Sequence, residues 1–385
     1  MTSTFFERRP DWIHYKHELL RKYLKPWTWK LSKRCSELAF IDTCAGEGLY
    51  GDGNAGSPLI AVRFNEDKVL QRKKCRLVVH AVEDNPTRAQ RLSEVLRKWC
   101  EREPPCAFIY NESFEKALPA LLERTRHVPT LVFIDPWGVR NLTADKLRPL
   151  LKDRARAPTE VLVRVDPTLF ARFSGWLKDG ENRDARWRKT ADSFRRLLNE
   201  LTINPEIAKQ IRHQEPGKGA RILRLFQAYL QMFMDRFAWV QIIPVRATYF
   251  AAPRYYLVHG TDSPHGAAKL NDVVSKTEDE LFEHSEAQQD GPQMRLLSSE
   301  RETDRHLQPR VRPEETVEYI TDLLKRRGPL EFIELRAELA LRYGPDLREK
   351  HHKSVLSGLI RDGVVNISPP GKITDRAIVQ LASRQ

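Results

Sequence analysis

Five short apolar segments, each followed at once by a polar residue, constrain the fold of this chain more than any other feature. They are Leu38 to Ile41, Arg76 to Val82, Ala107 to Tyr110, Thr130 to Ile134 and Val161 to Val165. Sequence with helical spacing of apolar residues separates them. Strands that alternate with helices in this way form a parallel sheet with helices on both faces. The sequence therefore predicts an α/β fold of the Rossmann-like kind.

Four of the polar residues that end these strands are suited to ligand binding. Asp42, Glu83, Asn111 and Asp135 follow the first four strands in chain order. Ligands of parallel α/β sheets bind outside the carboxyl ends of the strands. We therefore expect these four side chains to border one site.

The first strand leads into a glycine-containing turn, Asp42-Thr43-Cys44-Ala45-Gly46-Glu47-Gly48. Glycine is needed where the backbone takes a positive φ or approaches a ligand closely. A Gly-x-Gly by itself also occurs in ordinary tight turns. Glu83 follows Gly46 by more than the ~20 residues of a compact dinucleotide unit. A glycine-rich segment at 49–57 accounts for the excess.

This pattern favours S-adenosylmethionine over a dinucleotide as the cofactor. A pyrophosphate needs a third glycine and a helix N-terminus pressed against it. Gly51 is present, but the segment around it is too polar and irregular for an immediate helix. The predicted cofactor-binding residues are Asp42, Thr43, Ala45, Gly46, Gly48, Glu83, Asp84, Asn111, Glu112 and Ser113.

The fourth strand ends in Asp135-Pro136-Trp137-Gly138, and we predict these four as the catalytic residues. An aspartate carboxylate and the next carbonyl can accept hydrogen bonds from an exocyclic amino group, while the aromatic ring stacks on the base. Such positioning directs the nitrogen toward the methyl donor. A base within a duplex would have to flip out first. The simpler alternative is a strand end followed by a turn.

The composition favours a polyanionic partner and a protein of the cytoplasm. Formal net charge is +13 and the pI is about 9.5, which favours nucleic acid. The alternative is a basic but merely solvated surface. Five cysteines without a CxxC indicate neither a disulfide framework nor a zinc site, so we expect reduced thiols and no metal. No signal peptide or apolar run of ~20 residues is present. Hydrolase and NTPase motifs are also absent from the sequence.

Three basic segments are candidates for contact with nucleic acid. Residues 11–34 interleave aromatic and cationic side chains, which can stack on nucleic acid or pack over the core. An arginine-dense helical insertion at about 168–240 is either a phosphate-contacting or a solvated face. The third helix of the C-terminal segment is either a duplex-contacting or a protein-docking element. The predicted nucleic-acid-binding residues are Arg183, Arg186, Arg188, Lys189, Arg348, Lys350 and Lys353.

The chain divides into three parts by pattern. Residues 1–283 form a domain of the class I methyltransferase kind, and residues 284–312 are polar enough for a linker. Three helices and two short strands at 313–385 predict a winged helix.

Four motifs resemble those of the three-Cys-motif partner (TcmP) family, whose members look like S-adenosylmethionine-dependent methyltransferases. They are FIDTCAGEGLYGDGNAGSPL, VEDNP, FIDPWG and YYLVHGTDSPHG. The resemblance covers roughly the first 275 residues. It implies that Asp42, Gly46 and Gly48 line the cofactor and that Glu83 contacts its ribose. It also implies that Asp135 to Gly138 receive the acceptor. The Asp135-Pro136-Trp137-Gly138 motif is also similar to the Asp-Pro-aromatic-Gly of tRNA guanine-N2 methyltransferases, and it lacks the second proline of DNA adenine-N6 enzymes.

Three functions follow from these observations. The first is methylation of an exocyclic amino group in RNA or DNA. The second is methylation of a protein, with a cysteine-rich partner implied by the family resemblance. The third is a non-catalytic module that binds the cofactor or nucleic acid.

Overall fold

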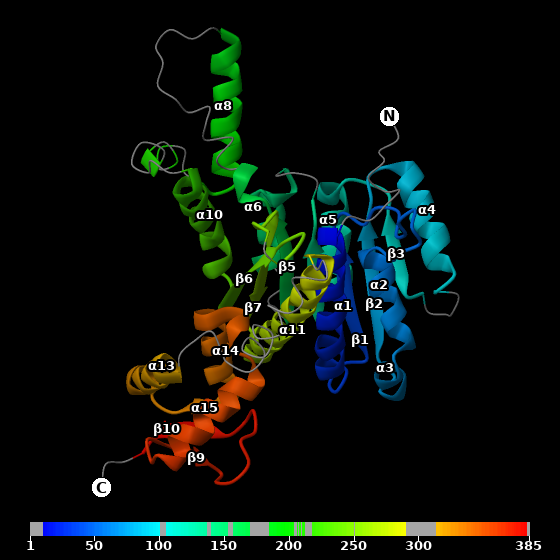
Figure 1. The fold of residues 1–385 in the computed structure, drawn as a ribbon. Helices are drawn as coiled ribbons and strands as arrows, with labels where there is room; N and C mark the ends of the chain where they lie inside the picture. Colours follow the sequence, from blue (N-terminus) through cyan, green and yellow to red (C-terminus); the bar gives the residue numbers. More distant parts are fainter. Residues whose placement is uncertain are drawn as a thin grey trace. The chain divides into compact units, whose positions relative to one another are not determined.

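The computed structural model describes residues 11–100, 105–136, 140–152, 157–169, 185–203, 206, 208, 210–211, 218–249, 251–289 and 313–382. It divides into two compact units, each described here by itself (Figure 1). The first comprises Met1–Ala247 and Ala252–Asp262, and the second Thr248–Ala251 and Ser263–Gln385. The boundary expected at residue 283 falls inside helix α11 (Pro264–Gln289), which belongs to the second unit.

A seven-stranded sheet organises the first unit. Its strands are β1 (Glu37–Asp42), β2 (Arg76–Val82), β3 (Ala107–Tyr110), β4 (Thr130–Ile134), β5 (Thr159–Val165), β6 (Trp239–Val245) and β7 (Tyr255–Thr261). They lie in the order β3-β2-β1-β4-β5-β7-β6. The first five are parallel, and β7 is antiparallel to β5 and β6. This order confirms the predicted Rossmann-like class I methyltransferase fold.

The first helix of this unit precedes β1, and the others lie between its strands. The helices are α1 (Asp11–Leu31), α2 (Ser57–Arg63), α3 (Lys68–Arg72), α4 (Pro86–Arg97), α5 (Phe114–Thr125), α6 (Ala144–Lys152), α8 (Ala185–Glu200) and α10 (Lys218–Met234). Helices α8 and α10 form the described part of the expected insertion. Short 3-10 turns lie at Phe64–Glu66 and Arg140–Leu142.

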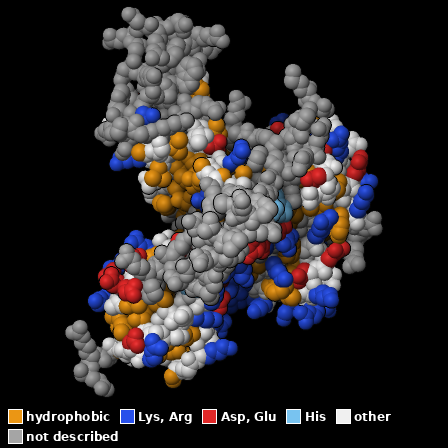
Figure 2. Space-filling model, in the orientation of Figure 1, with side chains coloured by type: hydrophobic (Ala, Val, Ile, Leu, Met, Phe, Trp, Pro, Cys, Tyr) orange, Lys and Arg blue, Asp and Glu red, His pale blue; other side chains and the backbone are white. Residues whose placement is uncertain are grey.

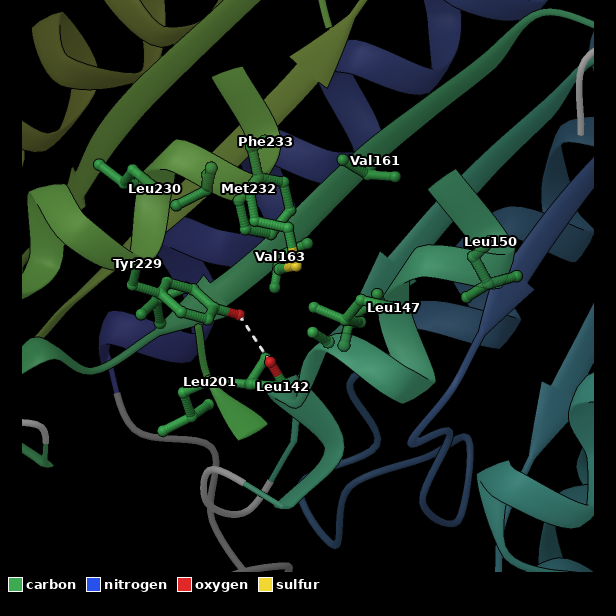
Figure 3. Close-up of a cluster of buried hydrophobic side chains, with 14 of the residues drawn as sticks. Leu142, Leu147, Leu150, Val161, Val163, Leu201, Tyr229, Leu230, Met232 and Phe233 are labelled. Atoms are coloured by element: carbon green, nitrogen blue, oxygen red, sulfur yellow. Dashed lines mark hydrogen bonds between the residues drawn. The ribbon is translucent and has the colours of Figure 1, made fainter. Parts of the chain in front are cut away.

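Different helices pack on the two faces of the sheet. Successive side chains of a strand point to opposite faces, so each face presents its own set of residues to its helices. On one face Ile134, Val161 and Val163 pack against α5, α6, α8 and α10. Figure 3 shows part of this core, where the Tyr229 hydroxyl donates to the Leu142 carbonyl at 3.0 Å. On the other face the rings of Phe40 and Phe133 stack, and α1 lies against that face.

Helix α1 is held to the sheet by a buried polar cluster that we call the Glu160 cluster, formed by Glu160, Tyr23, His259 and Gln241. The Glu160 carboxylate accepts from the Tyr23 hydroxyl and lies 3.2 Å from His259 Nε2. The other ring nitrogen of His259 lies 3.2 Å from Gln241 Oε1. Tyr15 and Trp27 of α1 are also buried. Tyr15, Tyr23 and Trp27 therefore pack over the core, in agreement with the second alternative for this segment, whereas Trp29 is only partly buried.

The cysteines differ from expectation in one respect. Cys100 and Cys106 form a disulfide, whereas Cys35, Cys44 and Cys75 are free. The first of the pair follows α4 and the second precedes β3, and this connection brings their Cα atoms to 5.3 Å. The expectation of reduced thiols is therefore wrong for this pair. The spacing of the two cysteines in the sequence matches no known motif and did not predict that they lie close together.

The second unit contains three further helices and a small antiparallel sheet. The helices are α13 (Pro313–Arg327), α14 (Phe332–Tyr343) and α15 (Glu349–Arg361), with a 3-10 turn at Gly344–Asp346. The strands β8 (Leu330–Glu331), β9 (Val365–Ser368) and β10 (Ile378–Leu381) lie in the order β8-β10-β9. These are the elements expected of a winged helix, which stays a prediction as a domain assignment.

Arg336 of α14 lies fully buried at the centre of the second unit. Its guanidinium pairs with Asp272 of α11 at 2.7 Å, Glu349 of α15 at 3.2 Å and Asp375 at 3.0 Å. A buried cation is stable only when it is paired. Arg336 thus fixes α11, α14 and α15 to one another.

Hydrophobic side chains reach the surface of the first unit over α10 and β6. Leu223, Met234 and Ile242 are the large exposed ones there, in a region where Figure 2 shows hydrophobic atoms on the surface. None of the helices in the described residues is long and apolar enough to cross a membrane. The same part of the chain holds no group of three or more His, Cys, Asp or Glu side chains that could bind a metal ion.

Candidate functional site

A cavity of about 130 Å³ lies at the carboxyl end of the sheet, within the first unit. Its wall comes from α1, from the turn after β1, and from the ends of β4 and β5 and the start of β7. The lining residues are Ile13, Lys16, His17, Cys44, Ala45, Gly46, Glu47, Gly48, Leu49, Tyr50, Gly56, Ser57, Asp135, Arg164 and Tyr255. Of the four strand-end side chains predicted to border one site, Asp135 belongs to this wall, whereas Asp42, Glu83 and Asn111 are not among its lining residues.

The turn after β1 requires its glycines. Gly46 and Gly48 have φ of +64° and +77°, which side-chain-bearing residues adopt rarely. A Cβ on Gly48 would lie 2.7 Å from the Leu92 side chain. The Gly48 carbonyl accepts from the Gly56 amide at 2.8 Å, so the glycine-rich segment folds back as a narrow loop. Both ends of that loop form part of the cavity wall.

Glu83 at the end of β2 holds the turn in place. Its carboxylate accepts from the Gly46 amide at 3.0 Å and from the Asn85 amide at 2.9 Å. Asn111 at the end of β3 donates to the Glu83 carbonyl at 3.0 Å. Burial raises the pKa of Glu83, although the Asn85 amide and the Arg88 guanidinium oppose the change. The tips of three neighbouring strands are thereby tied together.

Asp42 lies directly behind the cavity wall and is fully buried. One oxygen accepts from the Cys44 amide at 3.1 Å, whereas Oδ2 has no hydrogen-bond partner among the described residues. Burial raises the pKa of Asp42 to about 7, which Ser57 and the Cys44 amide offset only in part. Burial also raises the pKa of the Cys44 thiol to about 12, so that thiol stays protonated. Buried polar atoms without partners are rare in folded proteins.

Asp135 forms the floor of the cavity between two cations. Oδ2 pairs with the Lys16 ammonium of α1, and Oδ1 lies 3.4 Å from the Arg164 guanidinium of β5. Burial by itself would raise the pKa of Asp135, but Lys16 and Arg164 outweigh it and leave the pKa below its ordinary value. The Arg164 guanidinium also lies 4.5 Å from the centre of the Tyr255 ring. We call Lys16, Asp135 and Arg164 the Asp135 cluster.

The remaining predicted cofactor residues lie outside the cavity wall. Thr43 is buried and its amide donates to the Phe133 carbonyl at 3.1 Å, which joins β1 to β4. Asp84 is exposed, with the Arg88 guanidinium at 3.8 Å. Glu112 and Ser113 precede α5 at the end of β3. Pro136 is buried beside the cavity, and Trp137 and Gly138 lie outside the described residues.

The predicted nucleic-acid contacts divide by exposure. On α15, Lys350 is exposed, whereas Arg348 pairs with Asp279 at 2.8 Å and Lys353 with Glu349 at 2.7 Å. Arg186, Arg188 and Lys189 lie on α8, with side chains outside the described part of the chain. Arg183 is outside it altogether. His352, also on α15, is buried, and the Arg336 guanidinium contributes to lowering its pKa.

Sequence reasoning missed seven residues of the cavity wall that carry reactive or charged groups: Lys16, His17, Cys44, Glu47, Tyr50, Arg164 and Tyr255. One signal was available for Arg164, since a cation within an apolar strand requires a partner. Arg164 and Glu160 have the same parity along β5 and so point to the same face of the sheet. Nothing in the sequence placed α1 over that face.

The cavity fits the amino-acid end of an S-adenosylmethionine-like molecule better than the whole of it. Its volume is below the roughly 300 Å³ at the lower end of small-molecule sites. Lys16 and Arg164 are suited to a carboxylate, whereas the unpartnered Asp42 Oδ2 lies behind the wall and would reach an ammonium group only if the wall moved. The polar groups present therefore fit the charged tail of that cofactor. A whole nucleoside requires the wall to move.

A scan of protein-family models returned no match to the sequence, and a search of curated proteins also returned none. Solved structures do match. A Legionella pneumophila protein assigned to family DUF519 is 10% identical over 69% of this chain and 92% of its own, with a TM-score of 0.38.

Two other solved structures carry functional descriptions. A Haemophilus influenzae protein described as a methylase is 19% identical over 38% of this chain and 72% of its own, with a TM-score of 0.23. A Clostridium thermocellum protein described as an rRNA methylase is 8% identical over 62% of this chain and 97% of its own, with a TM-score of 0.29. At such TM-scores we draw nothing from these likenesses, and the fold rests on the strand order.

Proposed function

We propose that this protein is an S-adenosylmethionine-dependent methyltransferase that methylates an exocyclic amino group of a base in nucleic acid. One observation carries the proposal more than any other. The Gly46 amide is bonded to the Glu83 carboxylate, and the same turn shares a cavity with Asp135. A glycine turn, a ribose-type acid and an acceptor-type acid thus converge at one edge of the sheet.

The cofactor, when bound, supplies a methyl group on a sulfonium that is already a good leaving group. The chain's own residues then have to position the acceptor and exclude water. They do not have to activate the methyl group. Gly46 and Gly48 allow the backbone to approach the ligand, and Asp42 braces the turn through the Cys44 amide. Glu83 retains acceptor capacity, because each carboxylate oxygen has two lone pairs.

Asp135 acts in this proposal as an acceptor of hydrogen bonds from the substrate amino group. Lys16 and Arg164 hold its pKa below the ordinary value, so Asp135 stays ionised and is a poor proton acceptor. It orients the nitrogen lone pair, and the proton released by the methylated nitrogen passes to solvent water.

The basic charge of the chain supports nucleic acid as the acceptor. Over α3 and α4, however, Figure 2 shows Lys and Arg side chains interspersed with acidic ones. The exposed Lys350 of α15 and the cations of α8 are the candidates for phosphate contact. This partner, and cytoplasmic location, are proposals.

A protein acceptor is the second candidate, and a neighbouring groove favours it. The groove holds about 500 Å³ between α1 and α2 and shares His17 with the cavity. Both signs of charge line it, including Arg63 and Glu66, over the apolar side chains of Ile60 and Phe64. A charge-balanced wall is better suited to a peptide than to a phosphate backbone. The TcmP resemblance, with its implied cysteine-rich partner, belongs to this candidate.

Transfer of labelled methyl groups to cellular RNA, DNA and protein tests both candidates. The nucleic-acid proposal predicts nuclease-sensitive label that Asp135→Asn abolishes. Label in a nuclease-resistant protein band would favour the second candidate. Absence of label from both nucleic acids with cofactor-bound protein would overturn the first, and absence of label from protein as well would leave a cofactor-binding module without chemistry.

A further inference from the structure

Both oxygens of the Asp135 carboxylate are already paired with cations in this structure. One carboxylate oxygen pairs with Lys16 and the other with Arg164. The proposed reaction needs the same carboxylate to accept from a substrate amino group. Each oxygen keeps a second lone pair, but a neutral amine has to compete at this carboxylate with two cations that are already bound.

The two cations differ in how readily they can move. Arg164 is stacked on the Tyr255 ring at 4.5 Å, and a guanidinium in such an arrangement is held in a fixed plane. Lys16 is a point charge on a flexible stem that reaches the cavity from α1. Lys16 is thus the cation that can give way.

Lys16 cannot leave Asp135 without another anion. Only 4% of its side chain is exposed, so water cannot take over the ammonium charge where it lies. An unpaired buried cation is strongly unfavourable. The cavity that Lys16 lines is also the one that fits an amino-acid tail, and that tail carries a carboxylate.

We propose that Lys16 exchanges partners when the cofactor binds, from the Asp135 carboxylate to the carboxylate of the cofactor's amino-acid end. This inference rests on the proposed function. The exchange leaves Arg164 on one oxygen of Asp135 and opens the other to the acceptor. The cofactor then binds before the acceptor, and each ligand raises the affinity of the other by the same factor.

Two ligands separate the tail from the nucleoside in a test that needs no acceptor. S-adenosylhomocysteine carries the amino-acid end, and 5′-methylthioadenosine has the same thioether nucleoside without it. Calorimetric titration of both into wild type, Lys16→Met and Asp135→Asn measures the exchange. Lys25→Met is the matched control, because it removes the same charge from an exposed position of α1.

The exchange predicts opposite effects of the two changes. Lys16→Met weakens S-adenosylhomocysteine by about tenfold or more, since a charge-assisted contact is lost, and leaves 5′-methylthioadenosine unchanged. Asp135→Asn tightens S-adenosylhomocysteine severalfold, because Lys16 no longer has a competing anion. Lys25→Met changes neither affinity. The double variant Lys16→Met/Asp135→Asn removes the ion pair as a unit and should bind as Lys16→Met does.

Three results would overturn the inference. Weaker S-adenosylhomocysteine binding in Asp135→Asn would mean that Asp135 holds the cofactor itself. Equal loss of both ligands in Lys16→Met, repeated in the double variant, would mean that Lys16 only supports the fold. Wild-type protein that binds neither ligand would remove the proposed function as well, which distinguishes that failure from the first two.

Discussion

Two buried carboxylate sites on the same face of one sheet have opposite states of hydrogen bonding. Toward the amino end of β5, Glu160 accepts from Tyr23 and contacts His259. At the carboxyl end of β1, Asp42 has an oxygen without a partner among the described residues, and Asp135 lines a cavity between two cations. The saturated cluster fixes the fold, whereas the unsaturated end leaves polar groups for a ligand.

Helix α1 joins these two ends. Lys16 and Tyr23 are seven residues apart, which places them on one side of the helix about 10 Å apart along its axis. Lys16 contacts the Asp135 cluster and Tyr23 the Glu160 cluster. The helix is thereby anchored at the saturated end and can exchange partners at the other. The two ends together indicate that a residue able to respond to a ligand, Lys16, is carried on a helix that is itself fixed to the sheet.

The largest effect is expected at the saturated end. Glu160→Ala should lower the free energy of unfolding by about 4 kcal/mol, because it leaves Tyr23 and His259 as buried groups without their acceptor. Urea denaturation measures it. Glu160→Gln keeps an acceptor oxygen and should cost about half as much. A loss below about 1 kcal/mol for the alanine variant would contradict a structural role for this cluster.

The opposite sign is expected at Asp42. A rise of its pKa from 3.8 to about 7 corresponds to a penalty on the order of 4 kcal/mol when the carboxyl is ionised. Asp42→Asn should therefore raise the free energy of unfolding at pH 8 by about 2 kcal/mol, since the new buried amide returns part of the gain. Loss of stability at pH 8 would show that the Asp42 oxygen is satisfied.

The pH dependence of that difference has a defined window. Between about pH 4 and pH 7 the unfolded chain ionises Asp42 while the folded chain keeps it protonated. The folded state then binds more protons, so wild-type stability falls with rising pH relative to Asp42→Asn. Paired urea titrations at pH 4, 5.5, 7 and 8 measure the difference. A constant difference over this range would contradict the raised pKa.

His352 in the second unit tests whether every unsatisfied buried group serves a ligand. Burial lowers its pKa to about 3, and neither ring nitrogen has a hydrogen-bond partner among the described residues. Below about pH 6.5 His352 binds a proton in the unfolded chain but not in the folded chain, so stability falls as pH decreases toward 3. His352→Leu should remove this loss and raise stability by about 2 kcal/mol at pH 5. An unchanged acid transition would contradict it.

The smallest expected effect is a difference in stability loss between alanine substitutions at two glycines of the turn region. Gly48 and Gly53 both have positive φ, but a Cβ at Gly48 meets Leu92 whereas one at Gly53 meets nothing within 4 Å. Gly53→Ala should cost about 1 kcal/mol from backbone strain, and Gly48→Ala about 1 kcal/mol more from the added contact. Urea denaturation of the pair measures the difference. Equal losses of stability in the two variants would show that the Leu92 side chain moves aside at no measurable cost.

Sequence patterns located the strands because each buried strand is a short apolar run that ends at a polar tip. The bounds of β2, β3 and β4 agree with the predicted ones, and with them Asp42, Glu83 and Asp135 reach one edge of the sheet. Lys16 and Arg164 could not be assigned in this way, because their role depends on which face α1 covers. The Cys100–Cys106 pair depends on chain geometry between α4 and β3, for which spacing alone gives no signal.

We propose that the unsatisfied end of the sheet binds S-adenosylmethionine. Calorimetric titration of S-adenosylmethionine into wild type, Asp42→Asn and Glu160→Gln at pH 8 tests it most directly. We expect saturable one-site binding to wild type and to Glu160→Gln, and loss of binding to the folded Asp42→Asn protein. No binding to wild type, or equal binding to Asp42→Asn, would contradict the account.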